Sequence, residues 1–567
     1  MKNIMIAEIF LHPAIPIFLG SLLIFVLKNK DNIISIGSLL LSLFVLFSMT
    51  GEMNLIYNLS LNGSIDSSHQ SLNYFSYSRL GFLFCLVYLV IAILGKLFSM
   101  YRDNYMEKAL VLIYIGSAIS VIFSGDFITF YIFWEIMAIA STFIIWSANT
   151  KASQEAGTRY LLIHLFGGII LLIGIVGLSF GTQDLTLRNL QGSDWYNWFI
   201  LIGILLNAGA PPLSSWIPDS YPEGSYSSTI FLSAYTTKTA VFALIVIFAG
   251  TKILIYIGLY MIMYGIIYAL LENDIRRILA YSIVNQVGFM VVGIGIGSEL
   301  ALNGTASHAF AHIIYKGLLL MSAGSVIYIT QKRKCTDVGG LYKLMPITTI
   351  CAIIGALSIS AFPLTSGFIS KSMITDASFQ QGLEFVWFML LVGSAGVFLH
   401  AGIKFPWFVF FNKDKNILAQ DPPLYMNIAM ILSAALCLLI GIFPSILYSI
   451  LPFEATYIPY TANHVISQTH LLLFSGLAFF VSLKYLERKL TITLDFDWFY
   501  RKAGNIINSF TSYFLCAIDF MTKKISDLIS YDRFAKVENY LIKQNNISLM
   551  ITVILIVFAF FILLNLN

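Results

Sequence analysis

The chain has 567 residues, of which 58% are hydrophobic and 11% charged, and its mean hydropathy is +0.83. This composition excludes a soluble globular protein and predicts a membrane protein with many spanning segments. The net charge of +4 is small, and no nucleic-acid partner is expected. The cysteines have neither paired nor metal-binding spacing, which predicts small apolar side chains without disulfides or a metal site: Cys85, Cys335, Cys351, Cys437 and Cys516.

In chain order, apolar runs of about 20 residues predict about sixteen transmembrane helices, and hence an all-α polytopic membrane protein. The runs begin near Ala7, Asn32, Leu80, Ala109, Asp126, Thr158, Trp198, Ser228, Ile253, Ile275, Asn303, Pro346, Phe385, Asn427, His470 and Ser548. A polar connection rich in Ser and Asn spans residues 51–78, and no nucleotide-binding loop or soluble domain is found.

The basic residues predict the topology in a cell (inner) membrane. One set of alternate loops carries Lys28, Lys30, Arg102, Lys108, Lys151, Arg159, Arg276, Arg277, Lys332, Arg333, Lys334, Lys343, Lys413 and Lys415. The other set carries little beyond Arg79, Arg188 and Lys252. The positive-inside rule therefore predicts that the basic set is cytoplasmic and that both termini lie on the outer side.

The stretch 201–240 predicts an interrupted helix. An apolar helix runs into Gly209, Pro211 and Pro212, and a later helix carries Lys238 at its middle. Proline removes a backbone donor and clashes with the preceding turn, and the freed groups are tolerated in lipid only inside protein or beside a wet cavity. A broken helix beside a buried lysine therefore indicates an ion path. The alternative is an ordinary proline kink with a lysine that reaches the interface.

The same pattern recurs in the second half of the chain. Residues 361–366, which include Pro363, echo residues 210–215, and Lys371 follows shortly after. The two segments are roughly 150 residues apart, and paired proline-interrupted segments are typical of transporters built from repeats. His164 has an echo at almost the same offset, near His312, and is a weaker member of the ionisable set.

Charged residues inside apolar helices are candidates for the transport chemistry. Glu135 lies several residues into such a helix, and Lys238, Lys316 and Lys371 are its candidate partners and relay sites. Burial raises the pKa of a carboxylate and a nearby lysine lowers it, so a Glu and Lys pair can change charge as a proton moves. Intramembrane ionisable residues are expected to be functional.

A second candidate is a row of bases on one helix. His308, His312 and Lys316 are spaced i, i+4, i+8 and lie on one face, which suits a proton wire. Two alternatives are a zinc pair, which lacks the glutamate of the zincin motif, and hydrogen-bonded core histidines. Lys404, together with His400, is expected near a helix end.

The chain changes character after Leu486. Residues 486–546 mix charged with apolar residues at helical spacing, which predicts an amphipathic helix on the cytoplasmic membrane face or along a neighbouring subunit. A final span is predicted at 547–564. The alternative is a linker without a partner.

These motifs resemble the family shared by the antiporter-like subunits of respiratory complex I (L, M and N type) and the Mrp-type multisubunit cation/proton antiporters. The resemblance rests on FWEIMA, PPLSSWIPDSYPE, TTKTAVFAL, LAYSIVNQVG, HAFAHIIYKGLL and FPLTSGFISK, and is nearest to the D-type member of the Mrp group. It implies two inverted five-helix repeats, discontinuous helices 7 and 12, a hydrated polar axis and a C-terminal lateral helix. It implies proton translocation by Glu135, Lys238, His308, His312, Lys316 and Lys371.

One position departs from the family pattern. The motif alignment places Asn207 where the family usually has a lysine, and asparagine cannot carry a proton. Either Lys238 supplies the positive charge for Glu135, or the protein conducts passively beside an active paralogue.

The predicted organisation has five parts: N-terminal helices at 1–107, a first repeat at 108–250, a second at 251–411, C-terminal helices at 412–485 and the lateral segment at 486–567. The predicted function is a proton-translocating subunit with no catalytic chemistry or cofactor of its own, and Na⁺ is a candidate second ion. Its predicted partners are paralogous antiporter-like subunits, small membrane subunits and lipid. Rival interpretations are a complex I-like or hydrogenase-complex pumping subunit and a scaffold that does not transport.

Overall fold

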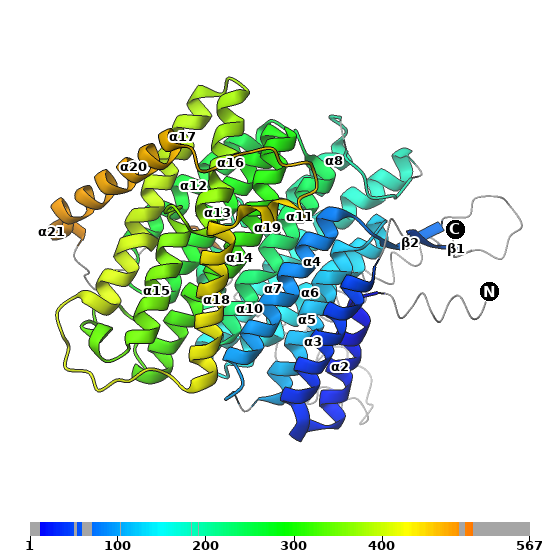
Figure 1. The fold of residues 1–567 in the computed structure, drawn as a ribbon. Helices are drawn as coiled ribbons and strands as arrows, with labels where there is room; N and C mark the ends of the chain where they lie inside the picture. The colour runs from blue at the N-terminus through cyan, green and yellow to red at the C-terminus, as the bar shows by residue number, and fades with distance from the viewer. Residues whose placement is uncertain are drawn as a thin grey trace, which may run out of the picture. The chain divides into compact units, whose positions relative to one another are not determined.

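The computed structural model describes residues 12–49, 54–58, 71–102, 104–182, 184–190, 192–486 and 494–502 (Figure 1). The chain divides into a first unit ending at Asp497 and a second beginning at Trp498. Within the described part of the first unit, most residues are helical. The predicted amphipathic helix and final span lie almost wholly outside the described residues.

The N-terminal part consists of two short-connected helices, a hairpin and a long helix. In order these are α2 Ala14–Val26, η1 Lys28–Lys30, α3 Asp31–Ser48, β1 Asn54–Asn58, β2 Ser71–Ser76 and α4 Arg79–Phe98. The strands pair antiparallel, with a bulge between Leu55 and Ile56. The all-α prediction is therefore wrong here. The Asn and Ser content of this stretch suggested a loop and concealed two strands.

The central part begins with helices that flank the first break. They are α5 Tyr105–Ile122, α6 Phe127–Trp146, α7 Lys151–Thr182, α8 Trp195–Ala208, α9 Trp216–Ser220, η2 Tyr221–Glu223, α10 Ser228–Ala234 and α11 Thr236–Phe248. The next group is α12 Ile253–Leu271, α13 Ile275–Ile296, α14 Glu299–Thr330, η3 Leu341–Lys343, α15 Pro346–Ile359, α16 Ser366–Gln380 and α17 Glu384–Val397.

The C-terminal part of the first unit follows two π-helical segments. These are η4 Phe398–Lys404 and η5 Trp407–Phe411, and then come α18 Leu424–Ile442, α19 Pro444–Tyr448, α20 Ala462–Val481 and α21 Leu483–Leu486. Within this unit α14 packs against α10, α15, α16 and α18, and its residues Ala301–Val326 are buried (Figure 1). Neighbouring helices thus cover α14 on all sides, including the face that carries His308, His312 and Lys316.

Twelve helices among the described residues are long and apolar enough to cross a membrane, and α2, α8 and α15 are shorter apolar helices. This confirms a polytopic membrane protein. The predicted total of about sixteen stays a prediction.

The predicted breaks at the prolines are present. Helix α8 ends at Ala208, Gly209 adopts φ +79°, and regular helix resumes at Trp216. Helix α15 ends at Ile359, and Pro363 lies in the turn before α16. Pro211, Pro212 and Pro363 therefore occupy interruptions between helices.

Two helix starts are built alike. Asp126 caps α6 by accepting from the backbone N–H groups of Ile128 and Thr129 at 2.9 and 2.7 Å. Asp274 caps α13 by accepting from those of Arg276 and Arg277 at 2.9 and 3.1 Å. A carboxylate that accepts these otherwise unpaired donors stabilises a helix N-terminus.

Candidate functional site

Lys238 is buried beside a helix interruption at Tyr235 that was not predicted from the sequence. Helices α10 and α11 are separated at Tyr235, and the Lys238 Nζ donates to the backbone oxygen of Ser233 at 2.7 Å and to Thr237 Oγ1 at 3.0 Å. Near a break, carbonyls lose their partners four residues ahead in the helix and can accept from a side chain. The ammonium is thus held by its own segment.

Lys371 is held in the same way. Its Nζ donates at 2.7 Å to the backbone oxygen of Ile359, the last residue of α15, and lies 4.8 Å from the centroid of the Phe289 ring. A cation at a helix C-terminus interacts favourably with the helix dipole, and an aromatic face adds attraction. The break at Pro363 therefore gives a buried lysine its acceptor.

Lys404 repeats this arrangement at the end of α12. Its Nζ donates to three backbone oxygens, those of Ala269, Leu270 and Glu272, at 2.5, 3.0 and 2.6 Å. Lys404 is fully buried, and the helical span that contains it continues to Phe411, so it does not lie at a helix end as the sequence suggested.

The three bases of α14 lie together in the interior. His308, His312 and Lys316 are at most 1% exposed, and the two imidazole centroids are 6.2 Å apart. His308 Nδ1 is 3.1 Å from Ser370 Oγ, and its Nε2 is 3.2 Å from Gln286 Oε1. Helical spacing brought these side chains to one face, as predicted, and the face points into protein.

Part of this row lacks hydrogen-bond partners among the described residues. Both ring nitrogens of His312 and the Nζ of Lys316 make no hydrogen bond in the structure. Buried polar atoms are nearly always paired with protein or with ordered water, so these atoms mark a place where water is expected.

Sequence reasoning missed Gln286, which helps to fix His308. Gln286 on α13 accepts from Tyr315 OH at 3.1 Å, faces His308, and donates to Asn285 Oδ1 at 2.6 Å. His400 on η4 is fully buried, with Nδ1 2.8 Å from the oxygen of Gly396. Gln286 belongs to LAYSIVNQVG, a motif whose polar residues were a usable signal.

Glu135 lies elsewhere, on α6 against α7. It is half-buried, and a Cβ added at Gly168 would come within 2.0 Å of its Oε1, so the carboxylate lies directly over that glycine. Oε1 has no hydrogen-bond partner among the described residues. The prediction that Lys238 pairs with Glu135 is wrong for this structure, because the ammonium is turned to Ser233 and no ion pair joins them in the described part.

His164 and Asn207 form a polar pair one helical turn from Gly168. The His164 ring packs against Tyr160 in a tilted arrangement with 4.0 Å between centroids, and it meets Trp216 edge-on at 4.6 Å. The Asn207 amide faces this imidazole, yet neither side chain makes a hydrogen bond within the described ranges. Both are buried, so the first half of the chain holds polar groups without fixed partners.

Nothing in the described part of the chain is arranged as a metal site of three or more His, Cys, Asp or Glu. The His308 and His312 pair is engaged with Ser370, Gln286 and Tyr315 contacts instead.

Interrupted helices that hold buried lysines, next to a buried row of histidine and lysine, define an antiporter-like membrane subunit as the class of protein. Residues 124–399 match the family described as NADH:quinone oxidoreductase/Mrp antiporter, TM. This match, together with the curated and structural relatives below, supports the antiporter-like family that Mrp antiporter subunits share with subunits of complex I.

One similar protein is the Na(+)/H(+) antiporter subunit A1 of Staphylococcus aureus (strain JH9), 27% identical over 518 aligned positions that cover 78% of this chain. The chain spans 64% of the length of that curated relative.

Solved structures share the fold. A chain of the Mrp complex from Dietzia sp. DQ12-45-1b superposes with a TM-score of 0.74 at 18% identity, covering 94% of this chain and 61% of that one. A chain of the archaeal membrane-bound sulfane sulfur reductase gives 0.69 at 22% identity, covering 96% and 99%. Respiratory complex I from Thermus thermophilus gives 0.67 at 18% identity, covering 78% and 99%.

Proposed function

We propose that this protein is a proton-translocating subunit of a multisubunit Mrp-type cation/proton antiporter. One observation carries the proposal: His308, His312 and Lys316 form a buried row that continues toward Lys371, whose ammonium is held at a helix break. Histidine gives and takes protons near neutral pH, and a buried lysine can do so when its environment disfavours the charge.

The relay uses the hydrogen-bonding groups of the row that have no partner among the described residues. His312 and Lys316 make no hydrogen bond within the described residues, so water that enters beside them connects them to their neighbours. Lys238 serves at one end and Lys371 at the other, with Lys404 beyond. Glu135 serves the first half as the residue that gains and loses charge, and His164 with Asn207 forms its polar surroundings.

Two inverted repeats are part of this proposal. The caps Asp126 and Asp274 lie 148 residues apart, and so do the residues that each pairs with in an isolated bridge, Thr186 and Lys334. Helices α7 and α14 begin 148 residues apart, at Lys151 and Glu299, and each has 32 residues. Such equal spacing favours descent from one duplicated unit of helices.

The finer assignment follows the motifs. The PDSYPE, TTKTAVFAL and ENDIRRILAYS runs favour the D-type member of the Mrp group. Na⁺ is the candidate for the exchanged cation. The partners are then other antiporter-like and small membrane subunits, with the basic loops and the C-terminal amphipathic segment at the cytoplasmic side.

A second candidate is a pumping subunit of a redox-driven complex. It is favoured by the likeness in fold to the sulfane sulfur reductase and complex I chains. The sequence carries no nucleotide, flavin or iron–sulfur motif, so electron transfer would occur in other subunits.

The test is proton flux by the purified assembly in proteoliposomes, read with an internal pH dye. Flux driven by an imposed Na⁺ gradient supports the antiporter, and flux only with NADH and quinone supports the redox complex. The double variant His308→Gln, His312→Gln should lose flux, whereas His470→Gln, which changes an exposed histidine, should keep it. Full flux in the double variant contradicts the relay and leaves the scaffold interpretation.

A further inference from the structure

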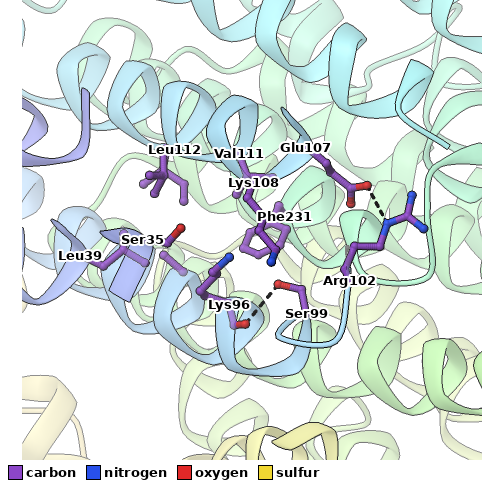
Figure 2. Close-up of a pocket in the computed structure, with 12 residues that line it drawn as sticks. Ser35, Leu39, Lys96, Ser99, Arg102, Glu107, Lys108, Val111, Leu112 and Phe231 are labelled. Atoms are coloured by element: carbon purple, nitrogen blue, oxygen red, sulfur yellow. Dashed lines mark hydrogen bonds and ion pairs between the residues drawn. The ribbon is translucent and has the colours of Figure 1, made fainter. Parts of the chain in front are cut away.

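A small cavity lies away from the row of bases, between α3, α4 and α5. It measures about 10 Å³ and is bordered by the basic side chains of Lys96, Arg102 and Lys108 and by apolar Leu39 and Leu112 (Figure 2). A cavity of this size holds a single small occupant, such as one water molecule or one monatomic ion. The cavity takes no part in the proposed relay.

Lys96 is the unusual member of this group. Its side chain is 4% exposed, and its Nζ has no hydrogen-bond partner in the described part of the chain. Figure 2 shows the Lys96 and Lys108 ammonium groups directed toward the same space. An ammonium taken out of water without a partner is costly, so this group is expected to be neutral or to have an occupant beside it.

The other charges of the cavity are already paired. Lys108 binds Asp31 at 2.8 Å, and Arg102 binds Glu107 at 3.0 Å. Glu107 also accepts from Ser147 and from Ser225 Oγ at 3.1 and 2.7 Å. Three cations therefore meet two carboxylates, and the excess positive charge belongs to Lys96.

The hydroxyl groups of the cavity are committed elsewhere. Ser35 Oγ donates to the backbone oxygen of Asp31 at 2.6 Å, and Ser99 Oγ donates to that of Lys96 at 3.1 Å. The free donors are therefore those of the two ammonium groups. The space they share has apolar walls and has no room for a branched oxyanion, whose several oxygens would each need a position.

We propose that this cavity binds one small monovalent anion, with chloride as the physiological ion. It lies between Lys96 Nζ and Lys108 Nζ and brings the group of five charges to neutrality. It holds together the ends of α3, α4 and α5, which contribute Asp31, Lys96 and Lys108 respectively. The site is independent of the proposed transport function.

The test is equilibrium binding of ³⁶Cl⁻ to the purified full-length protein in its complex. Lys96→Met should weaken binding by about tenfold or more, because it removes one of two cations at the ion. Bromide should compete with chloride, whereas phosphate and gluconate should not. The control Lys151→Met changes a lysine whose side chain is 92% exposed and should bind as the unaltered protein does.

Melting temperature gives a second measurement. The unaltered protein should melt higher in KCl than in potassium gluconate, since an ion that binds only the folded state stabilises it. Lys96→Met should lose this difference. Equal chloride binding by Lys96→Met and the unaltered protein, or competition by phosphate, would overturn the proposal. If Lys96→Met does not fold, anion competition in the unaltered protein decides: competition by bromide but not by phosphate supports the proposal, and competition by phosphate overturns it.

Discussion

The region around Glu135 and the region around Lys316 hold their polar groups in different ways. In the second, His308 is placed by Ser370 and by Gln286, which is itself bonded to Tyr315 and Asn285. In the first, Glu135, His164 and Asn207 lie near one another without hydrogen bonds among the described residues. The second region therefore has one histidine fixed by hydrogen bonds, whereas none of the three side chains in the first is fixed in this way within the described ranges.

Both regions use interrupted helices to bury lysine without a carboxylate. Lys238, Lys371 and Lys404 each donate to backbone oxygens near the end of a helix. These carbonyls have no partner in their own helix, so the lysines satisfy them and are satisfied in return. Each of these helix ends therefore holds a buried cation.

The largest effect is expected from Glu135→Gln, which keeps the shape of the side chain and removes its titration. Transport by the intact complex should fall by about tenfold or more, because Glu135 is the single acid within α6 that can exchange a proton. Assembly should persist. The control is Glu155→Gln, which changes a carboxylate 57% exposed on α7. Full transport by Glu135→Gln would erase the difference between the regions.

Replacing single lysines should distinguish, by the change in stability, a lysine held by a hydrogen bond from a lysine without one. Lys371→Met leaves the Ile359 carbonyl buried without its partner, at a cost of about 1–3 kcal/mol in stability. Lys316→Met removes an ammonium that has no partner in the described structure, so stability should hold or rise. Both should reduce proton flux. Melting curves of the two variants check this, and an equal loss of stability would contradict it.

The proline breaks and the row of bases could be predicted from sequence, because each follows from a local rule. Proline ends a helix, and the spacing i, i+4, i+8 puts His308, His312 and Lys316 on one face. The break at Tyr235 could not be predicted, because the run around it contains neither glycine nor proline. It is a product of packing around Tyr235, which meets Tyr88 and Tyr114.

Partners across helices were the weakest part of the prediction. Residue types suggested that Lys238 pairs with Glu135, but Ser233, five residues before it, supplies a nearer acceptor. Gln286 was missed because its value depends on α13 lying beside α14, which no periodicity reveals. Local pattern therefore predicted which residues are buried, and tertiary packing decided which of them meet.

A smaller effect is expected from Gly168→Ala. The added Cβ would meet the Glu135 Oε1 at 2.0 Å, so the carboxylate must turn away, which a flexible side chain can do at low cost. Transport should fall while the melting temperature changes little. Gly250→Ala is unsuitable as a control because of its positive φ, whereas Gly37 has open space around it and serves. Normal transport by Gly168→Ala would show that this position of Glu135 is not required.

Asn207→Lys tests the effect of restoring the lysine that related proteins usually have at this position. The new ammonium would stand beside His164, one turn from the glycine that supports Glu135, and an adjacent cation favours the ionised carboxylate. Infrared difference spectra should therefore show a shifted Glu135 titration in Asn207→Lys. Lys238→Ala should disable transport and change the Glu135 band less, since Lys238 is turned to Ser233. A larger shift in Lys238→Ala would restore the pairing that the sequence suggested.

The smallest effect concerns Arg333, which joins the two halves of the chain by binding Glu223 before α10 and Asp274 at the start of α13. Burial alone would raise the pKa of the Glu223 carboxyl, but the hydrogen bonds and charge of Arg333, with the charges of Arg276 and Arg277, lower it below its ordinary value of 4.5. A lowered pKa contributes stability that is present above the ordinary value and is lost as pH falls through the folded-state value.

Arg333→Gln should therefore destabilise the protein by about 1 kcal/mol at neutral pH, since the pair is partly exposed to solvent. The difference in stability between Arg333→Gln and the unaltered protein should shrink as pH falls below 4.5, because Glu223 then becomes protonated in both proteins. Denaturation midpoints measured across this range check the prediction, with Arg188→Gln as the control for an exposed pair with Asp184. A stability difference that stays constant with pH would show that Arg333 acts through packing and not through the charge of Glu223. The two halves of the chain would then be joined here without an electrostatic link.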